Sequence, residues 1–280
     1  MITVTYNSEG IRVNVGHISK YNKNLPLKLN IRKHVSGEIQ WSSNLNDNWF
    51  ATYPNTEMFD VEILDSKGVI VYTKKWDIME HGNHFYKSLW LYNKSLLSNG
   101  KFPTGLVIGT HDGEFGEWVP IVQKRECKVV LVEASDKQFN KLKHNYRYHS
   151  LVKPIQNLIT TNGGEVEFFE GGEGYTNSVV EGVIRSWEKE EIKSTKRSSI
   201  SITDLILNEC DGQIDWLHLD VEGLDAELIM SIDETKVQLP NFIIFEDHNL
   251  SIDKKNEIYS WFHNKGYKTY SEGGICEAVK

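Results

Sequence analysis

Cysteine is scarce in this sequence of 280 residues, which contains only Cys127, Cys210 and Cys276. The three lie far apart and form no CxxC pair, which excludes a disulfide framework and a cysteine-rich zinc site and favours a reducing compartment. Long apolar runs are also lacking, since those at 129–132 and 242–245 are far shorter than the roughly 20 residues of a membrane span. The first residues show no basic and apolar leader. We therefore expect a cytoplasmic protein without a membrane span.

An excess of basic charge is absent as well. Lys and Arg total 31 against 39 Asp and Glu, which gives a formal net charge of −8. Such a chain offers nucleic acid no overall positive field, so we expect no nucleic-acid partner. The basic stretch at 137–147 could still contact an acceptor that carries a phosphate group. Apolar residues make up 39% of the chain and are spread along it, which excludes disorder as the main state.

Residues 1–80 show the alternation of apolar and polar residues that is typical of short β-strands. Two such runs flank the turn sequence Asp-Ser-Lys-Gly at 65–68, which predicts a hairpin. The spacing of the runs predicts a small all-β, sandwich-like accessory domain. Its aromatic residues have three interpretations, namely a sandwich core, which we favour, a sugar-stacking surface, or a dimer interface that would make the protein a homo-oligomer. These residues are Trp41, Trp49, Tyr53 and Trp76.

Residues 81–280 alternate between strand-like and helix-like patterns. The expected strands lie at 106–108, 129–132, 154–159, 166–169, 216–219 and 242–245. The expected helices lie at 84–97, 117–123, 136–148, 203–209, 225–231 and 254–265. Near-continuous apolar strands that alternate with helices predict an α/β domain with a doubly wound, mainly parallel sheet. The highly charged segment 187–196 is expected to be an exposed loop or helix.

A glycine-rich turn follows the first strand of this α/β region. Gly109, Gly113 and Gly116 come directly after the apolar run 106–108, where glycines let a cofactor approach the backbone closely. The spacing is not that of the dinucleotide-binding motif, and a plain tight turn explains it equally well. Glu133 ends the second strand, where a carboxylate can accept both hydroxyls of a ribose. The alternative for Glu133 is that it is merely an exposed residue near the start of the next helix. The joint pattern of strand, glycine turn, second strand and acid nevertheless predicts an adenosine-containing cofactor.

Acidic residues follow two later strands of the predicted sheet. Asp220 and Glu222 come after the strand at 216–219, and Glu246 and His248 come after the strand at 242–245. Ligands of open α/β sheets bind at the carboxyl ends of the strands, so these side chains are expected at one edge of the sheet. Such a cluster suits general-base chemistry or a divalent cation with oxygen ligands. The alternative for Glu222 and Glu246 is a purely structural role in hydrogen bonding.

These motifs together resemble the FkbM family of S-adenosylmethionine-dependent methyltransferases over about residues 85–280. The run LDVEG at 219–223, with Glu227 beyond it, is similar to the family motif KIDVEGxE, and SITDL at 201–205 is similar to TLDDL upstream of it. The turn IGTHDG at 108–113 resembles the cofactor loop VGANxG, and FEDH at 245–248 resembles a late ExH strand end. The resemblance implies a class I methyltransferase fold.

Three positions depart from the family pattern. Val107 stands where the family has an acid before the glycine loop, which weakens the expected grip on the methionine amino group unless Asp112 replaces it. His218 replaces the family lysine, and Thr110 with His111 replaces the Ala-Asn pair.

The resemblance also implies which residues form the site. It implies cofactor contacts from Gly109, Thr110, His111, Asp112, Gly113, Glu133, Ala134, Ser135, Asn157 and Asp220. It implies catalytic groups near the acceptor at Asp220, Glu222, Glu246 and His248. A divalent cation held by Asp220, Glu246 and Asp247 is a weaker hypothesis.

The activity that the resemblance implies is methyl transfer from S-adenosylmethionine to a hydroxyl of a sugar or glycan. Since a hydroxyl is a poor nucleophile, a positioned base or a metal must take up its proton. Two alternatives remain open, namely transfer to a non-sugar hydroxyl or a nitrogen, and a non-catalytic binding protein whose cofactor site has degenerated at Val107.

Overall fold

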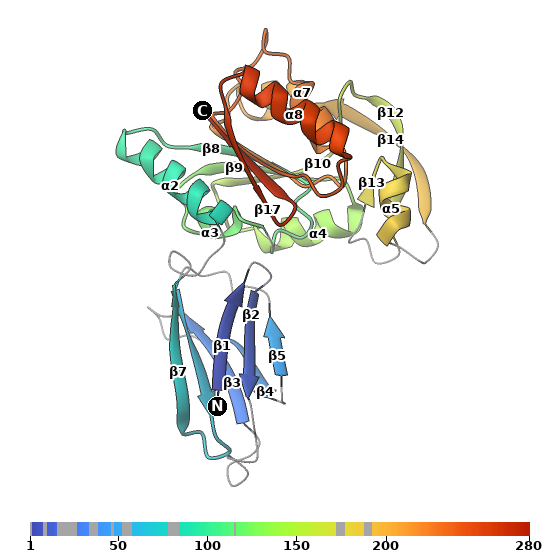
Figure 1. Ribbon diagram of the computed structural model, residues 1–280. Coiled ribbons are helices and arrows are strands. Elements are labelled where there is room, and N and C mark those ends of the chain that lie inside the picture. Colours follow the sequence, from blue (N-terminus) through green and yellow to red (C-terminus); the bar gives the residue numbers. More distant parts are fainter. Residues whose placement is uncertain are drawn as a thin grey trace. The chain divides into compact units, whose positions relative to one another are not determined.

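The chain consists of two compact units, Met1–Ser88 and Leu89–Lys280, which are described separately below. The computed structural model describes residues 2–7, 10–15, 27–33, 39–45, 48–51, 58–77, 84–114, 116–171, 177–187 and 192–280. The boundary between the units lies inside helix α2 (His84–Ser98), a few residues beyond the boundary predicted at 80. Figure 1 shows the all-β unit in blue and the larger unit in green to red. No helix among these described residues has the length and apolar character to cross a membrane.

The first unit contains two antiparallel sheets. One has the order β1-β2-β5 and the other the order β4-β3-β6-β7. The strands are β1 (Ile2–Asn7), β2 (Gly10–Val15), β3 (Leu27–Lys33), β4 (Ile39–Leu45), β5 (Asn48–Ala51), β6 (Met58–Leu64) and β7 (Ile70–Asp77). The hairpin predicted at 65–68 is confirmed, because the carboxylate of Asp65 accepts hydrogen bonds from the backbone N–H groups of Lys67 and Val69, both at 2.9 Å. The side chains of Trp41, Trp49, Tyr53 and Trp76 lie outside the described part of this unit.

The second unit is built on a seven-stranded sheet of order β10-β9-β8-β15-β16-β18-β17. Its strands are β8 (Thr104–Ile108), β9 (Lys128–Glu133), β10 (Val152–Gln156), β15 (Trp216–Leu219), β16 (Phe242–Glu246), β17 (Lys268–Glu272) and β18 (Ile275–Val279). The first five strands in this order are parallel, and β18 is antiparallel to both of its neighbours. The predicted doubly wound, mainly parallel sheet is therefore confirmed. The C-terminal antiparallel hairpin was not predicted.

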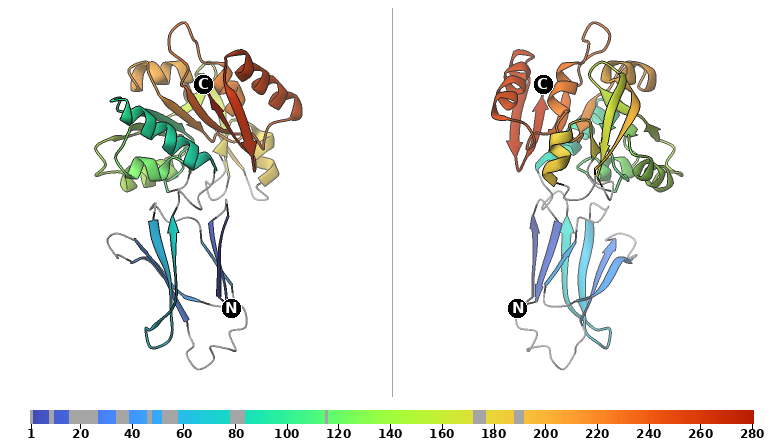
Figure 2. Two further views of the ribbon diagram at one scale, coloured as in Figure 1. Left: turned by 60° about the vertical axis from the view of Figure 1, so that its left-hand side comes forward. Right: turned by 90° about the vertical axis from the view of Figure 1, so that its right-hand side faces the viewer.

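Helices cover both faces of this sheet (Figures 1 and 2). They are α2, α3 (Val119–Gln123), α4 (Asp136–Asn145), α6 (Ile202–Glu209), α7 (Asp225–Met230) and α8 (Ile252–Asn264). Helix α5 (Glu181–Trp187) instead contacts a second sheet, which is described below. Alternate residues of each central strand point to one face, where Leu217 and Ile243 join the buried cluster that α6, α7 and α8 complete. On the other face the ring of Tyr92 on α2 lies 5.2 Å from that of Phe242. The sheet is apolar on both faces, as its strand sequences predict.

A second, four-stranded sheet of order β11-β14-β12-β13 adjoins the central sheet. It contains β11 (Leu158–Thr160), β12 (Gly164–Glu170), β13 (Asn177–Ser178) and β14 (Lys193–Ser201). The single strand predicted at 154–159 is wrong, because the chain changes sheets at Asn157. The loop or helix predicted at 187–196 is wrong from Lys193 onward, since β14 begins there. Five of the first six side chains of β14 are exposed, which explains why its sequence resembles a loop.

Candidate active site

The glycine turn after β8 brings the ends of two neighbouring strands into contact. Gly109 has a φ of 84° and donates its N–H to the carbonyl of Val132 at 3.0 Å. A Cβ atom on Gly109 would lie 1.8 Å from the carbonyl oxygen of Asp220, at the end of β15. Only glycine fits this position, because both the backbone conformation and the space exclude a side chain. Gly113 is enclosed similarly by the side chains of Tyr146 and Leu142.

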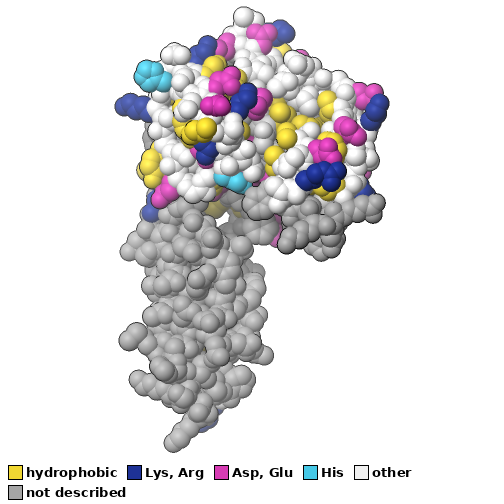
Figure 3. Space-filling view, turned by 45° about the vertical axis from the view of Figure 1, so that its right-hand side comes forward, with side chains coloured by type: hydrophobic (Ala, Val, Ile, Leu, Met, Phe, Trp, Pro, Cys, Tyr) yellow, Lys and Arg dark blue, Asp and Glu magenta, His cyan; other side chains and the backbone are white. Residues whose placement is uncertain are grey.

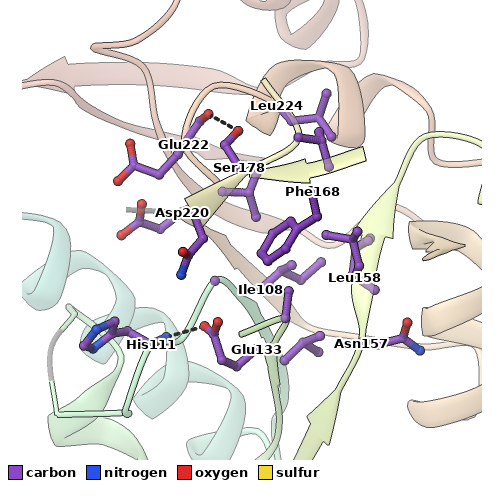
Figure 4. A pocket seen from close by; sticks show the side chains of 17 residues that line it. Ile108, His111, Glu133, Asn157, Leu158, Phe168, Ser178, Asp220, Glu222 and Leu224 are labelled. Atoms are coloured by element: carbon purple, nitrogen blue, oxygen red, sulfur yellow. Dashed lines mark hydrogen bonds between the residues drawn. The ribbon is translucent and has the colours of Figure 1, made fainter. Parts of the chain in front are cut away.

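Glu133 is a buried carboxylate at the end of β9. Its two oxygens accept hydrogen bonds from the backbone N–H groups of His111 and Ser135, each at 2.8 Å. Only 6% of the residue is exposed. Burial raises the pKa of Glu133 to about 7, although these hydrogen bonds act in the opposite direction. The glycine turn and Glu133, which lie far apart in the sequence, are thus joined directly by the hydrogen bond from His111 (Figure 4).

A cavity of about 260 Å³ opens above these strand ends. One side of it carries the carboxylates of Asp220 and Glu222, and the opposite side carries Leu158 and Phe168 (Figure 4). Glu133 lies between the two sides. The full lining is Ile108, Gly109, His111, Val132, Glu133, Ala134, Asn157, Leu158, Ile159, Phe168, Asn177, Ser178, Val179, Asp220, Val221, Glu222 and Leu224. The cavity is therefore divided into an acidic end and an apolar end.

Three carboxylates converge at the acidic end. Asp220, Glu222 and Glu246 each place one oxygen within 4.8 Å of the other two. The amide nitrogen of Asn249 donates to Glu222 at 3.0 Å and to Glu246 at 3.1 Å. Nδ1 of His248 lies 2.9 Å from an oxygen of Glu246. We call Asp220, Glu222 and Glu246 the acidic trio.

The surroundings of the acidic trio favour protonated carboxyl groups. Asp220 opens onto the cavity yet lies deep among protein atoms, and this burial together with the charges of Asp225 and Glu222 raises its pKa to about 7. Burial and the charges of Asp220 and Glu222 raise the pKa of Glu246 to about 9. Burial also raises the pKa of Glu222. Near neutral pH the trio therefore retains at least one proton, or binds a cation in its place.

The turn that carries Glu222 has an unusual backbone. Glu222 has a φ of 55° and Gly223 a φ of 98°. A left-handed conformation is costly for a residue with a side chain, so the surroundings must hold it. The buried carboxylate of Asp225 accepts from the N–H of Gly223 at 3.3 Å, and the hydroxyl of Ser178 donates to the carbonyl of Glu222 at 2.9 Å. This strain at the acidic end is typical of a functional turn.

The structure brings together most of the predicted site residues. Of the predicted cofactor residues, the cavity wall contains Gly109, His111, Glu133, Ala134, Asn157 and Asp220, and it excludes Thr110, Asp112, Gly113 and Ser135. Asp112 instead accepts the N–H of Glu114 at 3.2 Å. Val107 is fully buried in β8, beside His218, whose Nε2 lies 3.1 Å from a carboxylate oxygen of Glu117.

Asp247 lies apart from the acidic trio. Its carboxylate interacts with the ammonium group of Lys255 at 3.3 Å, the hydroxyl of Ser271 at 2.7 Å and the hydroxyl of Tyr259. Glu222 occupies the place that the sequence assigned to Asp247 beside Asp220 and Glu246. Sequence reasoning also missed Phe168 and Ser178, which reach the cavity from the four-stranded sheet.

The raised pKa of Glu133 predicts how stability depends on pH. Because the folded protein binds this proton more tightly than the unfolded chain, the contribution of Glu133 to the free energy of unfolding falls as pH rises from 4.5 to about 7. The decrease amounts to about 3 kcal/mol. We expect Glu133→Gln to remove this decrease from the pH dependence of the free energy of unfolding, measured by denaturant unfolding between pH 4.5 and 8. An unchanged slope would contradict the assignment, whereas a constant offset reflects only the altered hydrogen bonds.

The parallel sheet, the glycine turn and the acid at the end of the next strand are features with which α/β domains bind nucleoside-containing cofactors at their strand ends. The chain belongs to the FkbM methyltransferase family, because the family model described as "Methyltransferase FkbM domain" matches residues 108–269. The protein is thus a methyltransferase by family. No curated protein matches the chain.

Solved structures of methyltransferases are distantly similar to the chain. A putative caffeoyl-CoA O-methyltransferase from Staphylococcus aureus has 13% identity and a TM-score of 0.42, with 72% of this chain and 95% of that one covered. An O-methyltransferase from Bacillus cereus in complex with SAH has 14% identity and a TM-score of 0.40, covering 69% and 81%. The N-terminal domain of human METTL16 in complex with SAH has 11% identity and a TM-score of 0.39, covering 70% and 68%. At these values the likeness assigns no substrate to this chain.

Proposed function

We propose that the protein transfers a methyl group from S-adenosylmethionine to a hydroxyl of a sugar or glycan. The observation that carries this proposal is the cavity itself, in which a buried carboxylate, Glu133, separates an apolar end from the acidic trio. An adenosine-containing methyl donor needs the buried carboxylate and the apolar end, and a hydroxyl acceptor needs the acidic trio. The sugar is proposed because a hydroxyl-rich acceptor suits carboxylates that accept hydrogen bonds.

The residues present fit S-adenosylmethionine. Gly109 lies in the cavity wall and carries no side chain, so its backbone can lie against a ligand there. Glu133 lies in the cavity wall, where its carboxylate would accept the ribose hydroxyls, and Leu158 and Phe168 provide the apolar surface that a purine requires. The backbone of His111 and Ala134 completes the wall between them.

The acidic trio would accept the proton of the acceptor. When bound, S-adenosylmethionine supplies an electrophilic methyl group on a positively charged sulfur. As the acceptor oxygen forms its bond to that methyl carbon and the carbon–sulfur bond breaks, the hydroxyl proton passes to a carboxylate. Asp220 is the best base, because it faces the cavity and its raised pKa of about 7 makes it a stronger base than an ordinary carboxylate. Glu246, with its pKa raised to about 9, would stay protonated at neutral pH.

A bound divalent cation is the alternative to a retained proton as the positive charge that balances the acidic trio. The acidic trio offers three carboxylate oxygens within 4.8 Å of one another, a donor set that suits Mg²⁺ or Ca²⁺. With a cation bound, two neighbouring hydroxyls of the acceptor would be polarised and oriented together. Methyl transfer after exhaustive chelation, with and without added Mg²⁺, decides between a metal and a purely proton-based mechanism.

Surface charge agrees with an acceptor other than nucleic acid. The face of the larger unit in Figure 3 carries acidic and basic side chains intermixed rather than a basic field. A nitrogen acceptor and a non-sugar hydroxyl remain the alternatives at the same site. The third alternative is that the protein is a non-catalytic binding module. In that case no acceptor would yield a labelled product.

Calorimetric titration with S-adenosylmethionine and S-adenosylhomocysteine tests the proposal. We expect micromolar binding by the wild type and a loss of about 100-fold in Glu133→Ala, because the variant loses charge-assisted hydrogen bonds to the ribose. Glu257→Ala, which truncates an exposed glutamate of α8, serves as the control and keeps full affinity. Absence of binding by folded wild-type protein would contradict the proposed cofactor. Binding justifies screening nucleotide sugars and glycans for methyl transfer.

A further inference from the structure

One arginine of the four-stranded sheet contacts two parts of the cavity wall and a neighbouring carboxylate. Arg197 lies on β14, and Nη1 donates to the carbonyl of Ala134 at 2.7 Å. Nη2 donates to the carboxylate of Glu170 on β12 at 3.2 Å. The central carbon of the guanidinium lies 4.9 Å from the ring centroid of Phe168. Ala134 and Phe168 both line the cavity, so Arg197 joins two wall segments that belong to different sheets.

The strand register explains this arrangement. In the antiparallel pair β12–β14, Arg197 is opposite Val166. Side chains alternate between faces along each strand, so Arg197 shares a face with Phe168, its diagonal neighbour on β12, and with Glu170, two residues further along β12. Phe168 is only 2% exposed, and the side chain of Arg197 is 22% exposed. The guanidinium therefore lies behind a ring whose other surroundings are the cavity and the core.

The position of Phe168 indicates which part of the cofactor it would contact. It lies with Leu158 on the apolar side of the cavity, across from Asp220 and Glu222 (Figure 4). The charged amino acid and sulfonium parts of the cofactor suit the acidic side, where the methyl group must meet the acceptor. The flat purine suits the apolar side, beyond the ribose carboxylate Glu133.

We propose that Arg197 is a positioning residue for cofactor binding, which holds the Phe168 ring and the Ala134 backbone as the wall against the purine. This inference rests on the proposed function. Arginine suits the role because its planar group stacks on the ring while its separate N–H groups reach Ala134 and Glu170 at the same time. Lysine has one compact charge and cannot make all three contacts.

Titration of the full-length protein with S-adenosylhomocysteine and with adenosine tests the inference. We expect Arg197→Met to lower the affinity for both ligands by the same factor, about tenfold, and Arg197→Lys to lower it less. Arg197→Met should add almost nothing in a Phe168→Leu background, because the arginine acts through the ring. Arg185→Met is the matched control, since Arg185 pairs with exposed Glu181 of its own helix, and it should bind both ligands like the wild type.

Three results would overturn the inference. The first is an affinity of folded Arg197→Lys and Arg197→Met equal to that of the wild type, which would make Arg197 purely structural. The second is a loss confined to S-adenosylhomocysteine, which would place Phe168 against the homocysteine part. The third is full additivity of Arg197→Met and Phe168→Leu. A wild type that binds no S-adenosylhomocysteine would instead overturn the proposed function, and the inference with it.

Discussion

Gly109→Ala is expected to abolish cofactor binding and to lower the free energy of unfolding by about 3–5 kcal/mol. The added Cβ would lie 1.8 Å from the carbonyl oxygen of Asp220, and this contact is with backbone that cannot rotate away. Relief therefore requires the ends of β8 and β15 to separate. That movement displaces the turn from Glu133, whose carboxylate accepts the N–H of His111 only while the turn is in place. Denaturant unfolding and calorimetric titration with S-adenosylhomocysteine measure the two effects.

Gly266→Ala is the matched control for this substitution. Gly266 has a φ of 82°, close to the 84° of Gly109, and a Cβ on Gly266 would meet nothing within 4 Å. It therefore bears the same backbone penalty, about 1 kcal/mol, without the collision. If Gly109→Ala proves no more destabilising than Gly266→Ala, the close approach to Asp220 is not a constraint on the fold.

The parallel core of the fold could be predicted from the sequence because its signals are local. Each central strand is a short apolar run bounded by polar turns, and each covering helix has its own period. The four-stranded sheet lacks such signals. Strand β14 has the composition of a loop because most of its side chains face water, and it pairs with β12 through a register that no local pattern specifies.

The contrast between segments with and without a local sequence pattern also explains which site residues could be predicted. Residues that follow parallel strands must meet at one edge, so Glu133, Asp220 and Glu246 could be predicted together before any coordinates. Phe168 reaches the cavity from the second sheet and Arg197 lies behind it, and their motif-free segments give no signal. Asp247 was assigned to the wrong side of β16, because neighbouring residues at a strand end point to opposite faces.

Asp220→Asn is expected to lower kcat by about a thousandfold while the protein stays folded. The amide has nearly the same shape as the carboxylate but cannot take up the acceptor proton. Glu246→Gln is expected to have a smaller effect, about tenfold, because the raised pKa keeps Glu246 neutral at neutral pH and Gln is likewise neutral and of similar shape. Single-turnover transfer of labelled methyl to an acceptor that the wild type methylates measures both. Asp211→Asn, at an exposed aspartate that follows α6, is the control and keeps wild-type kcat.

The pH profile separates a base from a residue that only shapes the site. Since Asp220 must be ionised to accept a proton, kcat/KM of the wild type should rise with pH and level off above about 7. The charge of Glu222 helps to raise the pKa of Asp220, so Glu222→Gln should move this rise to lower pH. An Asp220→Asn variant that keeps a third of the wild-type kcat, or a Glu222→Gln profile that moves upward, would contradict the assignment. If chelation also removes activity and moves the profile, the acidic trio would instead be the ligand set of a divalent cation, which would supply the polarisation of the acceptor hydroxyl.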